Sequence, residues 1–216
     1  MITKYGYDVF FAIMGICVIM VVLSFVFTEP RFLRFSILLV AVVLFGFTLN
    51  FFRDPDRETP SGDGMVISPA DGKVVLIKPV EEQEFLKGKA TQISIFMSPL
   101  NVHVNRVPLS GTVSYYRYVP GEYFAAFEDK ASEKNEQTHI GIQGSKGKVL
   151  FKQIAGFVAR RIVCNLKVGD HAAAGERFGM IKFGSRVDVF LPPGAISRVA
   201  VGDVAVAGET ILAELP

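Results

Sequence analysis

The hydrophobic residues of this chain follow two different patterns, one before and one after residue 52. Residues 8–27 and 35–52 are two long apolar runs. After the leading Asp8 the first run contains no charged residue, and the second is interrupted only by small or weakly polar residues and by Asn50 near its end. Each run is close to the ~20 residues with which a helix crosses the hydrocarbon core of a bilayer. The pattern predicts two transmembrane helices, which form a membrane anchor over residues 1–52.

The linker between the two runs is short, residues 28–34, and it contains Pro30. We therefore expect the two helices to form a hairpin. A cleavable signal peptide fits poorly, because its apolar core would be shorter and no second span would follow it directly. The anchor implies that the rest of the chain acts on something at the membrane, and whether the hairpin crosses the bilayer completely is left open.

A hairpin places the N-terminus and the rest of the chain on the same side of the membrane. Lys4, Arg53 and Arg57 favour the cytoplasmic side for these parts, whereas Arg31 and Arg34 in the linker favour the opposite arrangement. We expect the cell (inner) membrane, with the domain after the hairpin on its cytoplasmic face.

After residue 52, short apolar runs alternate with Gly, Pro, Asp and Asn. The runs are only a few residues long and are rich in β-branched and aromatic residues, which is typical of strands rather than helices. Only residues 122–135 offer a helix or a mobile loop. The sequence predicts that residues 53–216 form a compact, mainly antiparallel β domain, with its clearest strands at 65–67, 74–77, 92–96, 111–116 and 149–151.

One internal repeat lies near the C-terminus. The segment 168–176 (VGDHAAAGE) recurs thirty-three residues later as 201–209 (VGDVAVAGE), and an apolar strand follows each copy, at 178–181 and 210–212. Similar units build the flattened barrels of lipoyl and biotinyl carrier domains. A carrier needs an exposed lysine in a tight hairpin between the two halves, whereas Lys182 is followed directly by Phe-Gly-Ser. The repeat therefore predicts a fold and not carrier chemistry.

Charge and cysteine content narrow the functional classes. Three of the 23 basic and two of the 21 acidic residues precede residue 53, which leaves 20 bases against 19 acids in the β domain. A nearly neutral domain has no long-range field that attracts a polyanion, so nucleic acid is excluded as a partner. Cys17 lies in an apolar run and Cys164 in an expected strand, so neither a disulfide nor a zinc cluster is expected. The sequence also lacks a P-loop, a Gly-x-Ser-x-Gly elbow and a His-Glu-x-x-His motif.

Gly184 and Ser185 interrupt the apolar, strand-like run 178–191. Glycine inside a strand usually marks a bulge or a close approach of two backbones. A serine hydroxyl next to such a flexible carbonyl can attack its own preceding peptide bond, which cuts the chain and makes residue 185 a new, reactive N-terminus. The alternative is an ordinary Gly-Ser turn.

Several polar residues in the expected strands and turns are candidates for chemistry. His103 shares one strand face with Asn105, and it is either a functional base or a satisfied structural histidine. Asp71 lies in an Asp-Gly turn, where its carboxylate either closes a hairpin or holds a histidine ring and stabilises the imidazolium. His139 and His171 are more typical of structural or surface positions.

Arg160 and Arg161 interrupt an apolar strand, either to protect a sheet edge or to clamp a phosphate.

The combination of candidate residues is more informative than any one of them. Asp71, His103 and Ser185 come from three separate strand ends of one β domain, which is how a nucleophile, a base and an orienting carboxylate assemble in space.

These residues lie in segments that resemble phosphatidylserine decarboxylases, specifically the short bacterial and archaeal branch of this pyruvoyl-dependent family. The resemblance covers nearly the whole chain after the anchor, and the segments follow one another in family order. They are 50–57 (NFFRDPDR), 68–72 (SPADG), 96–106 (FMSPLNVHVNR), 118–121 (YVPG), 159–162 (ARRI) and 179–186 (GMIKFGSR).

The resemblance implies a zymogen that cuts itself between Gly184 and Ser185. In that family the serine attacks the preceding carbonyl, the peptide rearranges to an ester, and elimination followed by hydrolysis leaves a pyruvoyl group. The larger subunit would be residues 1–184, and the small one residues 185–216 with a pyruvoyl N-terminus made from Ser185. Asp71 and His103 would activate the serine, and the two subunits would stay together because they share one β core.

The resemblance also implies a lyase of phospholipid biosynthesis that acts on phosphatidylserine in the bilayer. The substrate amine would form a Schiff base with the pyruvoyl ketone, carbon dioxide would leave, and hydrolysis would release phosphatidylethanolamine. The pyruvoyl group would act as the electron sink that pyridoxal phosphate provides elsewhere, so neither pyridoxal phosphate nor a metal is expected. His103 is the candidate proton donor, and Arg160 or Arg161 is the candidate for the lipid phosphate.

Two positions differ from the longer bacterial and mitochondrial branch. Arg106 stands where that branch has a second histidine, and Arg186 stands where it has a threonine. His103 is therefore the only histidine of its motif, which leaves open how two histidine roles would be divided here.

Three other functions are open from the residues alone. The first is a membrane-tethered carrier or adaptor without enzymatic activity, the second a pyruvoyl enzyme for a soluble amino acid, and the third a serine hydrolase that uses Ser185, His103 and Asp71. Acyl-chain preference and the formation of a homo-oligomer are also left open.

Overall fold

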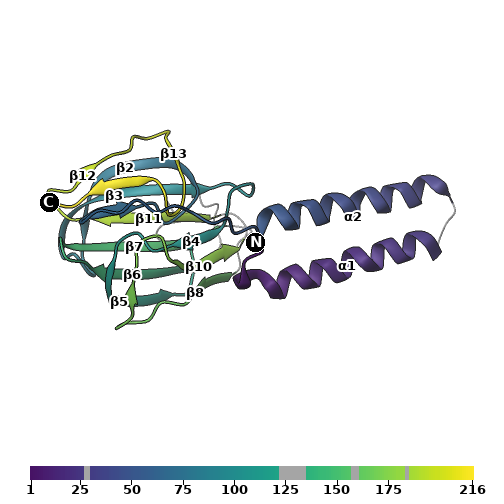
Figure 1. The fold of residues 1–216 in the computed structure, drawn as a ribbon, viewed down its shortest axis with the longest axis horizontal. Helices are drawn as coiled ribbons and strands as arrows, with labels where there is room; N and C mark the ends of the chain where they lie inside the picture. Colours follow the sequence, from purple (N-terminus) through teal and green to yellow (C-terminus); the bar gives the residue numbers. More distant parts are fainter. Residues whose placement is uncertain (27–29, 122–134, 157–160, 183–184) are drawn as a thin grey trace. The chain divides into compact units, whose positions relative to one another are not determined.

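The computed structural model describes residues 1–26, 30–121, 135–156, 161–182 and 185–216. The chain forms two compact units, Met1–Pro55 and Asp56–Pro216. The named elements of the first unit are helices, and those of the second unit are all strands (Figure 1). The predicted fold class, an apolar two-helix N-terminal segment followed by a β-rich domain, is confirmed.

The first unit contains a short 3₁₀ helix and two long α-helices: η1 (Lys4–Gly6), α1 (Tyr7–Val26) and α2 (Arg31–Phe51). Helix α2 begins at Arg31, before the apolar run at residue 35 that suggested it. Pro30 is the N-cap residue with extended backbone angles, and its carbonyl oxygen accepts a bond of 3.0 Å from the N–H of Leu33. Because arginine is a good helix former, the first turn does not need apolar side chains to be helical.

Both long helices direct their apolar side chains outward. Phe11, Phe35 and Val42 are each more than 60% exposed, and both helices are long and apolar enough to cross a membrane. The hydroxyl of Ser24 donates back to the carbonyl of Val21 within the helix, so it needs no water. Such a surface is stable in lipid and costly in water.

The second unit contains three antiparallel sheets. An eight-stranded sheet has the order β13-β2-β3-β11-β7-β6-β5-β9, and two three-stranded sheets have the orders β1-β14-β12 and β4-β10-β8. All pairs among the named strands are antiparallel, and the five clearest predicted runs all lie in strands. The strands are β1 (Met65–Ile67), β2 (Gly72–Glu82), β3 (Gly88–Met97), β4 (Val104–Arg106), β5 (Gly111–Val119), β6 (Gln137–Gln143), β7 (Lys148–Ala155), β8 (Arg161–Cys164), β9 (His171–Ala172), β10 (Arg177–Lys182), β11 (Ser185–Leu191), β12 (Ile196–Ser197), β13 (Val204–Ala205) and β14 (Ile211–Glu214).

The main core of this unit lies on one face of the eight-stranded sheet, because side chains alternate along each strand. In β11, Val187 and Val189 belong to the large apolar cluster, whereas Arg186 and Asp188 alternate with them and point to the other face. Ser185, by the same alternation, is on the core face.

The two copies of the repeat form equivalent structures at opposite ends of the eight-stranded sheet, as strands β9 and β13. The N–H of Gly169 donates to the carbonyl of Val113, and the N–H of Gly202 donates to that of Val74, both at 2.8 Å. Both glycines have a positive φ, 98° and 105°, which glycine adopts without steric cost. The repeat therefore sets the two edges of the sheet. The predicted likeness to carrier domains stays a prediction.

The run 178–191 is not one strand. Its first part belongs to β10 in the sheet with β4 and β8, and its second part is β11, an interior strand of the eight-stranded sheet. Phe183 and Gly184 lie outside the described residues. The chain therefore passes from one sheet to another between Lys182 and Ser185 instead of continuing as one strand.

The cysteines can be compared with the sequence prediction, whereas two other predicted features fall largely outside the described residues. Cys17 and Cys164 are free thiols. The segment 122–135 was expected to be a helix or a mobile loop, and all of it except Asn135 lies outside the described residues, as does Arg160.

Candidate active site around Ser185

Ser185 is fully buried at the first position of β11, directly between Met97 of β3 and Ala155 of β7. Its Oγ donates a hydrogen bond of 3.1 Å to the Met97 sulfur. A thioether is a weak acceptor. The hydroxyl is therefore placed in a dry interior without being committed to a strong partner, an arrangement that suits a nucleophile. Gly184, the other half of the predicted cleavage site, lies outside the described residues.

His103 lies directly before β4 and is fully buried. Its Nδ1 is 2.9 Å from the carbonyl oxygen of Asn101. A carbonyl oxygen only accepts, so Nδ1 carries the proton of the neutral ring and Nε2 carries the lone pair. The structure thus assigns Nε2 as the basic nitrogen of His103.

Asp71 lies in the turn before β2, where the Asp-Gly signal was found. Its carboxylate accepts from the guanidinium of Arg57 at 3.0 and 3.3 Å and from the N–H of Ala207 at 2.8 Å. Sequence reasoning did not identify Arg57 as a partner, although Arg57 belongs to the first segment of the family resemblance after the anchor. The turn and the carboxylate are both held in place by these bonds.

The segments that contain Asp71, His103 and Ser185 meet in the interior of the β unit, and Asn105 joins them. Its Nδ2 is 3.3 Å from the carbonyl oxygen of Pro69 and 3.8 Å from the Met97 sulfur that Ser185 contacts. A relay that runs directly from Asp71 through His103 to Ser185 stays a prediction.

The arginines of the sequence motifs have different surroundings. Arg161 is exposed at the start of β8, and its cross-strand partner in β10 is Lys182. Arg106, which stands where the longer branch has a second histidine, is buried and donates to the carbonyl of Gly175 at 2.9 Å. Arg106 therefore ties β4 to the first copy of the repeat.

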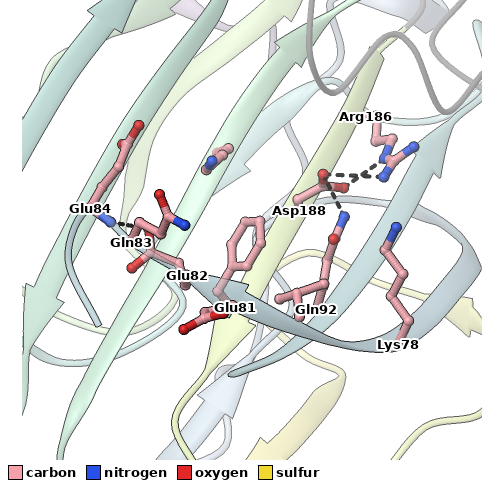
Figure 2. Close-up of a pocket in the computed structure, with 11 residues that line it drawn as sticks. Lys78, Glu81, Glu82, Gln83, Glu84, Gln92, Arg186 and Asp188 are labelled. Atoms are coloured by element: carbon pink, nitrogen blue, oxygen red, sulfur yellow. Dashed lines mark hydrogen bonds and ion pairs between the residues drawn. The ribbon is translucent and has the colours of Figure 1, made fainter. Parts of the chain in front are cut away.

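A polar pocket of 580 Å³ lies on the opposite face of β11 from Ser185 (Figure 2). Arg186 and Asp188 point into it from neighbouring outward positions and form a buried ion pair, with Nε and Oδ1 2.6 Å apart. The guanidinium also donates to Ser94 at 2.9 Å, and Gln92 donates to Asp188 at 2.9 Å. These groups therefore satisfy one another on the face of β11 that lies away from Ser185. The sequence signal that could have revealed this network is the alternation of Arg186, Val187 and Asp188 within an apolar run.

Comparison with known proteins identifies the family of this chain. Residues 44–213 match the family model described as phosphatidylserine decarboxylase. The chain is 46% identical over 210 residues to a phosphatidylserine decarboxylase proenzyme of Chlorobium phaeobacteroides, covering 97% of this chain and 98% of that protein. It is 45% identical over 214 residues to the protein of the same name from Pelodictyon phaeoclathratiforme, covering 99% of both chains. A third such proenzyme, from Chlorobium luteolum, is 48% identical over 185 residues, which are 85% of this chain and 86% of that one. The chain belongs to the phosphatidylserine decarboxylase family.

Proposed function

We propose that this chain is a membrane-anchored phosphatidylserine decarboxylase that makes its own pyruvoyl group from Ser185. The observation that carries the proposal is the place of the Ser185 hydroxyl. It is fully buried at the start of an interior strand, where the chain has just passed from one sheet to another, and it donates to a weakly accepting sulfur. Membership of the phosphatidylserine decarboxylase family indicates the reaction in which this serine would take part.

The proposed cleavage is a reaction of the chain with itself. Ser185 Oγ attacks the carbonyl carbon of Gly184, the peptide C–N bond breaks, and the nitrogen takes up a proton, which leaves an ester. Elimination then removes the Cα proton of residue 185 to a base and breaks the bond between Oγ and Cβ, so that Gly184 ends in a carboxylate and residue 185 becomes dehydroalanine. Water adds to the tautomeric imine, ammonia leaves, and a ketone remains at residue 185.

His103 is the proposed base for this cleavage, with Nε2 receiving the hydroxyl proton of Ser185 and returning it to the departing nitrogen. Asp71 is proposed to stabilise the positively charged imidazolium that forms in between. The bonds from Arg57 and Ala207 fix the position of the Asp71 carboxylate, so its charge does not have to be reoriented during the reaction.

The two fragments are expected to remain one folded unit after the cut. β11 would be the first strand of the small fragment, and it pairs with β3 on one side and with β7 on the other, both in the large fragment. Two more strands of the small fragment also pair with strands before residue 184, since β13 pairs with β2 and β14 with β1, whereas β12 pairs with β14. Separation would break all of these ladders.

When present, the pyruvoyl group supplies the electron sink that decarboxylation of an amino acid headgroup requires. The residues around position 185 fit such a group, because Met97 and Ala155 flank it and water is excluded. His103 is proposed to deliver the proton that replaces the carboxylate. Arg160 or Arg161 is proposed to bind the lipid phosphate, and the cross-strand pair of Arg161 and Lys182 places two cations at the strand ends next to residues 183–185.

The substrate and the product are proposed to be phosphatidylserine and phosphatidylethanolamine in a cell membrane. The two exposed apolar helices support a membrane location, because a lipid substrate has to be met where it resides. The cytoplasmic face is proposed from the basic residues that flank the hairpin.

Intact-mass analysis of the purified full chain tests the proposal. We expect two fragments, 1–184 and 185–216, with the small one blocked at its N-terminus and reactive toward a hydrazide. An uncut chain that still releases carbon dioxide from phosphatidylserine vesicles would refute the proposed prosthetic group. An uncut chain without this activity would favour the carrier, adaptor or hydrolase alternatives.

Single substitutions then test the assigned roles. Ser185→Ala should abolish both cleavage and decarboxylation. His103→Ala and Asp71→Asn should slow cleavage by about 100-fold or more, in the range of general acid–base contributions. Normal processing of both variants would remove these two residues from the relay.

A further inference from the structure

A chain of buried polar side chains leads through the core to Ser185. Thr138 Oγ1 donates to Gln153 Oε1 at 2.6 Å, and Gln153 Nε2 donates to Asn105 Oδ1 at 2.9 Å. All three side chains are at most 2% exposed. Buried amides are costly unless they are hydrogen-bonded. A series of them in a β core therefore needs a reason beyond packing.

Two backbone carbonyls fix the direction of this chain. The carbonyl oxygen of Val163 is 3.4 Å from Gln153 Nε2, and the carbonyl oxygen of Pro69 is 3.3 Å from Asn105 Nδ2. Carbonyl oxygens accept only, so both amides must turn their NH₂ groups toward them. Reversing the amides would place oxygen against oxygen at both ends. The NH₂ group of Asn105 is thereby held on the side of Pro69 and Met97.

Asn105 and Ser185 both direct donors at the sulfur of Met97. Asn105 Nδ2 is 3.8 Å from this sulfur, and Ser185 Oγ is 3.1 Å from it. The oxygen end of Asn105 has a short bond to Gln153, whereas its NH₂ end has only longer contacts. The amide is therefore anchored at its acceptor end, and the weaker of its two donor contacts is to the Met97 sulfur that Ser185 also contacts.

We propose that Asn105 donates a hydrogen bond to the oxyanion that forms when Ser185 attacks a carbonyl carbon, and that Gln153 and Thr138 position its amide for this role. The inference rests on the proposed self-cleavage. The negative charge forms on an oxygen bonded to the same carbon as Oγ, so it forms beside the hydroxyl. In a water-excluded site a donor that is already in place stabilises such a charge strongly.

A purely structural role makes a different prediction. If the amides only tie β4 to the eight-stranded sheet, then losing them should lower the melting temperature, and cleavage should slow only as far as folding is impaired. If Asn105 stabilises the oxyanion, cleavage should slow far beyond the loss of stability.

The test follows the conversion of freshly synthesised full-length chain, inserted into lipid vesicles, into its two fragments. Asn105→Ala should cleave about 100-fold more slowly, the usual effect of removing one oxyanion donor. Asn105→Asp should be at least as slow, because the carboxyl group keeps the acceptor for Gln153 but loses the amide donor. The matched control is Ile142→Ala, a core truncation in β6, which should lower the melting temperature yet cleave within about threefold of wild type.

Positioning by Gln153 and Thr138 predicts a graded series. Gln153→Leu should slow cleavage less than Asn105→Ala, and Thr138→Val less again, whatever the order of their melting temperatures. Slowing that follows the melting temperatures instead would overturn the inference. Cleavage of Asn105→Asp at the wild-type rate would overturn it as well.

Hydroxylamine provides a second readout, since it cuts esters but not ordinary peptide bonds. The Asn105→Ala chain should resist hydroxylamine at residue 184, because its ester forms slowly and does not accumulate. A hydroxylamine-sensitive ester that accumulates in this variant would show that the first step does not need Asn105, and would overturn the inference. An uncut wild-type chain would refute the proposed function and this inference together, whereas a cut wild type beside normally cut Asn105 variants would refute this inference alone.

Discussion

The buried ion pair behind Ser185 allows a quantitative prediction. The side chains of Arg186 and Asp188 are 3% and 1% exposed, and the guanidinium and carboxylate form two bonds of 2.6 and 3.2 Å. Ser94 and Gln92 complete the network, as Figure 2 shows for Gln92. Two charges have thus been moved out of water, and each is compensated by the other.

Removing one partner leaves the other charge buried and uncompensated. Arg186→Met or Asp188→Leu alone should therefore cost about 3–5 kcal/mol of unfolding free energy. Replacing both residues removes both charges and leaves only the bonds of Ser94 and Gln92 unmade, at about 1–3 kcal/mol. The double variant should consequently be more stable than either single variant.

The assay is thermal unfolding of the full chain in detergent, with Ser185→Ala in every variant so that cleavage does not change the chain. For a unit of this size, about 2–4 °C accompanies each kcal/mol, so each single variant should melt roughly 6–20 °C lower. A double variant that loses as much as the two single variants combined would refute the reasoning, because it would show that the two charges do not compensate each other.

Two further predictions concern the β unit. Gly111→Ala should destabilise the protein by about 1–3 kcal/mol, because its Cβ would meet a backbone carbonyl of the neighbouring strand. Gly88→Ala is the control and should be close to neutral, because nothing lies within 4 Å of the Cβ that it would add. Equal melting temperatures of the two variants would contradict this prediction. Burial and the Lys152 ammonium lower the pKa of His139 from its ordinary 6.5, although the Glu84 carboxylate acts in the opposite direction. The folded state therefore binds this proton less well than the unfolded state, so unfolding free energy should fall as the pH decreases below about 6.5. Urea unfolding at pH 7 and pH 5.5 should show this loss in the wild type and less of it in His139→Gln.

The candidate site was located from the sequence only in part. Ser185, His103 and Asp71 were chosen by residue type and by family resemblance, and the structure gathers their segments in one interior. Arg57, Gln153 and Thr138 were not identified, because their partners lie 14, 48 and 15 positions away in the chain. No local period of hydrophobic and polar residues encodes such pairs.

The two apolar helices, the β character of the rest and the position of the Gly-Ser pair could be predicted from the sequence. These features depend on local properties, namely the length of an apolar run, the preference of β-branched residues for strands and the identity of neighbouring residues. The sequence did not reveal that 178–191 crosses from one sheet to another, or that Ser185 and Asn105 contact the same Met97 sulfur. These features needed the folded chain, because strand partners and buried hydrogen bonds join distant segments, and Ser185 meets Met97 across 88 residues of chain.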